Sequence, residues 1–163
     1  MRRGVRLGVD VGSVRVGLSA SDPDGLIATP VETLARDLRG ATDQSRIVDE
    51  VTRREAVEVV VGLPVSLSGR EGPAADAVRG YAAELARRVA PTPVRLVDER
   101  LSTVSAHQAL RASGRRGRQH RQVVDQVAAV LVLQTALDAE RASGRPPGSK
   151  IEPGPAPEPP APV

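Results

Sequence analysis

The sequence predicts an α/β protein in which a mixed sheet combines an antiparallel meander with parallel strands. Three consecutive segments near the amino terminus alternate apolar and polar residues, which is typical of strands. Two further strand-like segments then alternate with helical ones, an order that favours parallel pairing. The length of 163 residues suits one domain with a substantial core and is short for two.

The first three strands are expected where turn sequences separate runs of alternating residues. The turns are Gly12-Ser13 and Pro23-Asp24-Gly25. Short turns between consecutive strands favour antiparallel pairing, so these segments predict the meander. The three strand segments are residues 5–10, 14–20 and 26–34.

The rest of the domain is expected to alternate helices with strands. Residues 42–56 have the pattern of an amphipathic helix, with Thr42 as a candidate N-cap. Residues 58–64 form a continuous apolar run, which is typical of a central parallel strand. The remaining expected elements are helices at 73–90, 102–113 and 122–142 and a strand at 93–98.

The composition changes after residue 142. Residues 143–163 contain eight prolines in 21 positions, and proline removes the backbone donors that helices and sheets require. We therefore expect a folded domain at 1–142 and a disordered, proline-rich tail at 143–163.

Composition also excludes several classes of site and location. The chain has no Cys and two His, which excludes disulfides and thiolate zinc sites and leaves little for a His-rich metal site. No secretory signal follows the basic first residues, and the longest apolar run, 127–133, is too short to cross a bilayer. We expect a cytoplasmic protein with no membrane partner.

The basic residues are almost all arginine. Of 23 basic residues, only Lys150 is not Arg. Arginine is a good bidentate ligand for phosphate, although a GC-rich genome would produce the same bias. With no Phe, no Trp and a single Tyr81, the chain does not fit a single-strand binder built on stacked aromatic side chains.

A carboxylate stands where the first expected strand meets its turn. Ligand sites of open α/β sheets lie at the carboxyl ends of strands, and Asp10 is at that end. Gly12 allows a close turn, and Ser13 and Arg15 could face an anion. The alternative interpretation is that Asp10 only caps the turn.

Two later strand ends carry further polar residues. After the central strand, Ser66 and Ser68 could donate to phosphate oxygens, or the segment is an ordinary loop. After the next strand, alternation puts Asp98 and Glu99 on opposite faces, so at most one of them faces the site. A solvated cluster of charges is the alternative there.

Two helix starts complete the set of candidates. Ser102 or Thr103 can cap the helix that follows Arg100, and a helix start is a natural anion site. Asp125 lies in the first turn of the long last helix, a place where acids are also favoured by the helix dipole. Two alanines one turn later would let that helix lie close against a sheet.

These stretches resemble the YqgF/RuvX family, whose members are described as Holliday junction resolvases and as pre-16S rRNA nucleases. The resemblance covers about residues 4–140. It implies a ribonuclease H-like fold, with a five-stranded sheet of order 3-2-1-4-5, the second strand antiparallel, and about four flanking helices. The motifs, in the family's order and spacing, are GVDVGSVRVG (8–17), VVGLP (60–64), VDERLST (97–103) and VDQVAAVLVL (124–133).

The resemblance also implies a nuclease site on Asp10, Glu99 and Asp125. Clustered carboxylates bind Mg²⁺ or Mn²⁺, which prefer oxygen ligands. Two such ions ~4 Å apart could activate water and stabilise the leaving oxygen in phosphodiester hydrolysis. The expected substrate contacts are Ser13, Arg15, Ser66, Ser68, Arg100, Ser102, Arg115, Arg116 and Arg118.

The basic stretch at 111–121 contains five Arg and precedes the last helix. Its position beside Asp125 favours a flexible electrostatic arm that contacts nucleic acid. A solvated loop is the alternative.

The chain departs from the related RuvC-type resolvases in one acid. The fourth carboxylate of the RuvC-type resolvases, in a D-x-x-D pattern, is replaced here by Ala128. Fewer acids predict weak metal binding. In the implied strand order Glu99 also starts two strands from Asp10, or ~9–10 Å away. Glu99 must therefore reach inward, or the site assembles only with substrate; Glu71 is the reserve candidate.

The resulting expectation is a metal-dependent nuclease that processes the 5′ end of pre-16S rRNA. A Holliday junction resolvase in DNA recombination or repair is the alternative, and a non-catalytic nucleic-acid-binding or ribosome-assembly factor is a further one. The expected partner is structured RNA or branched DNA. No exposed apolar stripe demands a dimer, so a monomer or weak homodimer is expected.

Overall fold

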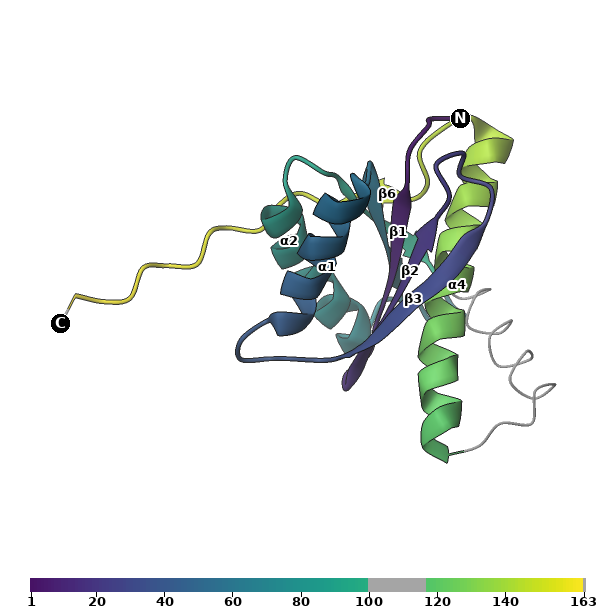
Figure 1. Ribbon diagram of the computed structural model, residues 1–163. Helices are drawn as coiled ribbons and strands as arrows, with labels where there is room; N and C mark the ends of the chain where they lie inside the picture. The colour runs from purple at the N-terminus through teal and green to yellow at the C-terminus, as the bar shows by residue number, and fades with distance from the viewer. Residues whose placement is uncertain (100–116, 163) are drawn as a thin grey trace.

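The structure, a computed structural model, describes residues 1–99 and 117–162, with residues 117–125 described by their backbone alone. These residues form three layers, in which a twisted sheet lies between two helices on one face and one long helix on the other (Figure 1).

The sheet joins an antiparallel half to a parallel half, as the sequence predicts. Its order is β3-β2-β1-β4-β5-β6. β2 is antiparallel to β1 and β3, whereas β4 is parallel to β1 and β5. The strands are β1 Arg6–Val11, β2 Arg15–Ser21, β3 Ala28–Ala35, β4 Glu58–Leu63, β5 Val94–Asp98 and β6 Ser149–Lys150. The expected order 3-2-1-4-5 is confirmed, with one added strand beside β5.

The helices bury the two faces of the sheet unequally. The helices described are α1 Thr42–Arg54, α2 Pro73–Val89 and α4 Gly117–Ser143. α1 and α2 cover one face with the larger core cluster, which includes Ile47 and Leu85, and α4 covers the other with Leu133 and Leu137 (Figure 1). The helix expected at 102–113 falls outside the described residues. None of the helices described is long and apolar enough to cross a membrane.

Alternation along β1 decides which side chains face α4. Leu7 and Val9 are buried in the core with α1 and α2. Gly8 faces α4, because a Cβ atom there would lie 2.7 Å from Leu133 Cβ. Asp10 is two residues further along the strand and therefore lies on the α4 face.

α1 begins differently from the expectation. Its N-cap is Ala41, in the left-handed conformation with φ 52°, and not Thr42. Asp37 is the reason, because its carboxylate accepts hydrogen bonds from the Gly40 N–H at 2.9 Å and from the Thr42 N–H and hydroxyl at 3.1 and 2.7 Å. These hydrogen bonds hold the pKa of Asp37 well below its ordinary value.

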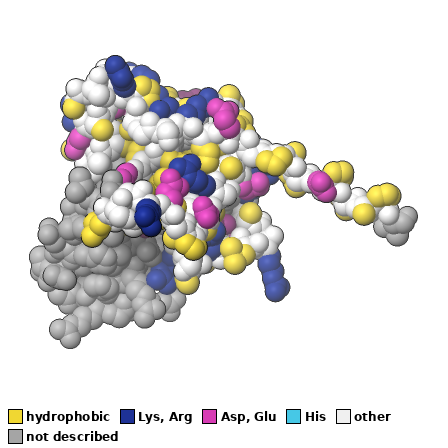
Figure 2. Space-filling view, turned by 180° about the vertical axis from the view of Figure 1, so that it is seen from behind, with side chains coloured by type: hydrophobic (Ala, Val, Ile, Leu, Met, Phe, Trp, Pro, Cys, Tyr) yellow, Lys and Arg dark blue, Asp and Glu magenta, His cyan; other side chains and the backbone are white. Residues whose placement is uncertain are grey.

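The segment after α4 docks on the domain, contrary to the expectation that residues 143–163 lie disordered outside it. β6 pairs antiparallel with β5, and the Ile151 N–H donates to Val94 O at 2.9 Å. The Gly154 N–H then donates to Ala83 O in α2 at 2.9 Å. The reason is a proline-free stretch, GSKIE, whose backbone donors are available for pairing. The residues that follow extend away from the body of the molecule (Figures 1 and 2).

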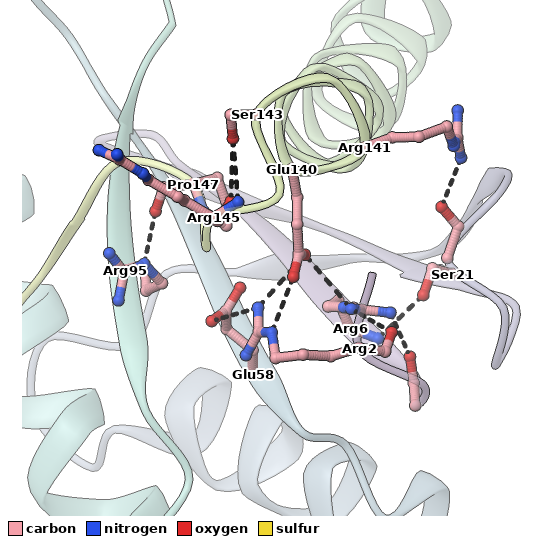
Figure 3. Close-up of polar contacts among 12 residues, drawn as sticks. Arg2, Arg6, Ser21, Glu58, Arg95, Glu140, Arg141, Ser143, Arg145 and Pro147 are labelled. Atoms are coloured by element: carbon pink, nitrogen blue, oxygen red, sulfur yellow. Dashed lines mark hydrogen bonds and ion pairs between the residues drawn. The ribbon is translucent and has the colours of Figure 1, made fainter.

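A buried charge network lies at the end of the sheet where β1 and β4 begin (Figure 3). Arg6 of β1 lies opposite Glu58 of β4 in the register of the two strands, and both side chains are 1% exposed. Glu140 of α4 contacts Arg2 Nε at 2.7 Å and Arg6 Nη2 at 3.3 Å. Arg2 Nη2 also contacts Glu58 at 3.1 Å. The network ties the amino terminus and the last turns of α4 to the sheet.

Candidate functional site

The carboxyl ends of the parallel strands meet at one edge of the sheet. Asp10 lies near the end of β1, and Glu99 directly follows β5. The backbone N–H of Glu99 donates to Leu63 O at 3.2 Å, which keeps this residue beside the end of β4. Both predicted acids therefore start from the same edge.

The carboxyl groups of Asp10 and Glu99 are in hydrogen-bonding contact. Burial raises the pKa of Glu99 above its ordinary value; the hydrogen bond with Asp10 acts in the opposite direction, and the charge of Asp98 raises it further. Two carboxyl groups in hydrogen-bonding contact share a proton or repel each other. The contact therefore creates a place that favours a positive charge.

Gly62 in β4 lies beneath the side chain of Glu99. A Cβ atom at Gly62 would lie 2.7 Å from Glu99 Oε2 and 3.4 Å from Glu99 Cβ. The side chain of Glu99 thus crosses over the backbone of β4, in space that any other residue at 62 would fill. This path overcomes the separation of two strands, ~9–10 Å, that the strand order imposes.

α4 runs along the face that carries the two acids. Ala129 and Val132 are buried against the sheet. A Cβ atom at Gly62 would lie 2.9 Å from Val132 Cγ2, and one at Gly8 would lie 3.0 Å from Ala129 O. Asp125 belongs to the same helix, one turn before Ala129. Its side chain lies outside the described residues.

The turn after β1 is held by a residue that the sequence analysis did not single out. The Gly12 N–H donates to Arg15 O at 2.8 Å, and a Cβ atom at Gly12 would lie 2.7 Å from that oxygen. Arg36 Nη1 donates to Gly12 O at 2.7 Å. The guanidinium of Arg36 also lies over the ring of Tyr81, 4.9 Å from its centroid. Because 24 residues separate Arg36 from Gly12, no local pattern could indicate this contact.

Two hollows open beside Glu99. One, of about 430 Å³, lies between the loop after β4 and the start of α2. The other, of about 360 Å³, lies between α2 and the turn after β1, where Ser13 and Arg36 line it. Pro64, Ala74 and Glu99 line both hollows, so the two are continuous past Glu99.

The two predicted serines after β4 belong to a closed loop. Ser66 Oγ and Ser68 Oγ are 2.9 Å apart, and the Arg70 N–H donates to Ser66 Oγ at 3.1 Å. Ser66 lines the larger hollow. The loop thus places Ser66 at the hollow that Glu99 also lines.

The reserve candidate, Glu71, is directed elsewhere. Arg79 Nε contacts its carboxylate at 2.6 Å, and this hydrogen bond lowers the pKa of Glu71. The structure therefore brings Glu99, and not Glu71, to Asp10.

The other expected substrate contacts divide into two groups. Ser13 is exposed on the turn, and Arg15 begins β2. Within the basic stretch at 111–121, residues 111–116 lie outside the described residues. Residues 117–121 form the start of α4. The expected contacts whose side chains lie outside the described residues are Arg100, Ser102, Arg115, Arg116 and Arg118.

The donor set at this edge fits a hard divalent cation. Asp10 and Glu99 supply carboxylate oxygens in contact, and Mg²⁺ and Mn²⁺ prefer oxygen ligands. A cation bound between the two carboxyl groups would offset the repulsion between them. Among the side chains that the structure describes, no group of three or more His, Cys, Asp or Glu could hold a metal ion.

Comparison with known proteins gives a consistent result at three levels. A family model described as "RuvX: Holliday junction resolvase" matches residues 4–139. A protein of Streptomyces coelicolor named "Putative pre-16S rRNA nuclease" is 57% identical over 153 residues, 93% of this chain and 90% of that protein. A Nocardioides protein of the same name is 57% identical over 157 residues, 93% of this chain and 99% of its own length.

The fold is also similar to a solved structure. The structure described as T. thermophilus RuvC in complex with Holliday junction substrate matches 91% of this chain and 99% of its own chain, with a TM-score of 0.55 and 15% identity. At that identity the similarity shows the common fold alone.

Proposed function

This chain belongs to the RuvX family, and on that premise we propose that it is a nuclease that hydrolyses phosphodiester bonds. The observation that carries the proposal is the contact between Asp10 and Glu99 at the carboxyl edge of the sheet. The two acids come from separate strands and are held together against their mutual repulsion. A turn cap would not need a second acid, and a solvated charge cluster would not bring two acids into contact.

The substrate that we propose is precursor 16S rRNA, cut at its 5′ end. Relatives 57% identical over 93% of this chain carry the name of a pre-16S rRNA nuclease. The second candidate is a four-way DNA junction, favoured by the description of the family model. Resolution of a junction needs two cuts, and therefore two copies of the chain on one substrate.

We assign Asp10, Glu99 and Asp125 as the residues that hold Mg²⁺ or Mn²⁺. When bound, such a cation activates water and stabilises the leaving oxygen. Asp10 and Glu99 supply ligands from two strands, and α4 carries Asp125 along the same face of the sheet. Weak binding is expected in the absence of substrate, because few carboxylates are available to hold the ion.

The turn and the loop around the acids hold the phosphate backbone. Ser13 and Ser66 offer hydroxyl groups at the two hollows that Glu99 lines, and Ser68 contacts the hydroxyl group of Ser66. Arg36 acts through Gly12 by holding the carbonyl of the turn. We assign neutralisation of the flanking phosphates to Arg15, Arg100, Arg115, Arg116 and Arg118, and a hydrogen bond to a phosphate oxygen to Ser102.

The proposal is tested with a cleavage panel under titration of Mg²⁺ and Mn²⁺. The substrates are an RNA that spans the 5′ end of 16S rRNA with its leader, an unrelated RNA hairpin and a four-way DNA junction. Asp10→Asn and Glu99→Gln should abolish cleavage. Glu71→Gln is the matched control, because it removes a nearby carboxylate that pairs with Arg79, and it should cut at the wild-type rate.

Each outcome decides between the candidates. Cutting of the leader RNA at one position supports rRNA processing, and paired cuts in the junction support resolution. Binding without cleavage at any metal concentration would instead show that the chain is a non-catalytic assembly factor.

A further inference from the structure

We propose that Gly62 is a positioning residue of the nuclease site, because its missing side chain gives Glu99 a path across β4 to Asp10. The link to cleavage rests on the proposed function. The role of Gly62 in the contact between Glu99 and Asp10 can be tested without a metal ion.

Strand pairing places Gly62 between the two acids. Val9 of β1 pairs with Val61 of β4, and Asp10 and Gly62 are the next residues of these strands. On the other side, Gly62 pairs with Val97, which comes two residues before Glu99. Gly62 and Glu99 therefore share a face of the sheet, and β4 lies between the start of Glu99 and its carboxyl partner.

A side chain at position 62 would occupy the place of the Glu99 carboxyl group. The position of a Cβ atom is 2.7 Å from Glu99 Oε2, closer than a carbon and an oxygen can pack. The colliding atom is the far end of a flexible side chain, which can swing away at little cost to the fold. The damage would therefore fall on the contact with Asp10 and not on the sheet.

The sequence around Gly62 makes its presence informative. β4 reads EVVVGL, and its residues are buried throughout. Glycine weakens a strand interior because it has no side chain to pack, and it often marks a place of close approach. Here two side chains, Glu99 and Val132 of α4, approach the position that a Cβ atom would take.

Close packing of α4 is the competing explanation for Gly62, and a second substitution separates the two. A Cβ atom at 62 would also lie 2.9 Å from Val132 Cγ2. Val132→Ala removes that methyl group and leaves Glu99 untouched. In the Val132→Ala background, adding Gly62→Ala therefore tests the collision with Glu99 alone.

The first measurement is Mn²⁺ affinity by calorimetry, with cleavage measured in parallel. Relative to Val132→Ala, the variant Gly62→Ala/Val132→Ala should bind Mn²⁺ about 10- to 100-fold more weakly, the usual loss when the support of a metal ligand is removed. Its cleavage rate should fall, while its melting temperature stays close to that of Val132→Ala. Gly80→Ala in α2, where a Cβ atom meets nothing within 4 Å, is the matched control and should leave affinity and cleavage unchanged.

The second measurement needs no metal. Melting temperatures are compared for Asp10→Asn, Glu99→Gln and the double variant, in the Val132→Ala background with and without Gly62→Ala. With Gly62 present, the two effects should be non-additive, because the groups touch. With Ala at 62, they should add.

The outcomes distinguish this inference from the proposed function. Unchanged Mn²⁺ affinity together with unchanged non-additivity in the Gly62→Ala background would overturn the role of Gly62. If instead the wild-type protein neither binds Mn²⁺ nor cuts, but the non-additivity disappears with Gly62→Ala, the positioning role stands and the nuclease proposal fails.

Discussion

Glu140→Gln is expected to destabilise the fold without changing the nuclease site, which lies at the other end of the sheet. Glutamine keeps the shape of the side chain but removes its charge. Arg6, 1% exposed, then keeps a buried guanidinium without the carboxylate that contacts it at 3.3 Å. Breaking one partner out of a buried ion pair costs about 3–5 kcal/mol. Arg2 is 39% exposed and can turn to water, so we expect the lower end, about 3 kcal/mol.

The assay is urea unfolding followed by circular dichroism. A loss of this size should lower the unfolding midpoint by on the order of 1–2 M, given the usual slopes for domains of this length. Asp138→Asn is the matched control on the same helix. Asp138 is 59% exposed and contacts Arg141 at 3.3 Å, and exposed pairs of this kind contribute less than about 1 kcal/mol.

The cost of Glu140→Gln should depend on pH with a definite sign. Burial alone would raise the pKa of Glu140, but the hydrogen bond from Arg2 and the charges of Arg2 and Arg6 bring it below its ordinary value of 4.5. The charged form therefore stabilises the fold above about pH 4.5, and this stabilisation is lost as the pH falls through the lowered pKa. The difference between wild type and Glu140→Gln should be largest near neutral pH and shrink in acid.

The reasoning would be refuted by a Glu140→Gln midpoint no lower than that of Asp138→Asn. It would also be refuted by a difference that grows as the pH falls. Either result would mean that Arg6 finds enough support in its hydrogen bonds to the carbonyl oxygens of Gly4 and Arg2.

Three further predictions concern the site and the segments around it. Asp10→Asn should abolish cleavage and raise the melting temperature of the metal-free protein, since it removes one of two carboxyl groups in contact; a wild-type rate would make Asp10 a turn residue only. Deleting residues 155–163 should leave the melting temperature unchanged, whereas deleting 144–163 should lower it by removing β6; equal melting curves would show that β6 contributes nothing. Replacing Arg115, Arg116 and Arg118 with alanine should flatten the slope of log K against log salt concentration for duplex DNA binding by up to ~0.9 per lost contact. An unchanged slope would mean that these arginines have no role in binding.

Local patterns were sufficient to predict most of the sheet. Alternation along β1 separates Leu7 and Val9 from Asp10, and that separation alone puts the acid on one face at the end of a strand. The continuous apolar run of β4 predicts a strand covered on both faces, and the structure covers it with α2 and α4. Both predictions follow from the period of side chains in a strand, which the sequence displays directly.

Other features depend on contacts between distant residues. The approach of Glu99 to Asp10 requires the exact strand order and an empty position in β4, although a glycine within an apolar run is a signal for such an approach. Arg36 holds a turn 24 residues away. β6 is a two-residue strand between proline clusters, and only the open edge of β5 gives it a partner.

β6 also has a consequence for the behaviour of the molecule at high concentration. Without it, β5 would present a row of unpaired backbone groups at the margin of the sheet, where a second molecule could add a strand and begin aggregation. β6 covers that margin with a short strand that carries Lys150, after which Pro153 limits further pairing. At the opposite margin, β3 carries Pro30 and Glu32, a missing donor and a charge that also discourage strand addition. β6 thus protects this margin of the sheet against self-association, and its loss would expose β5 to strand addition.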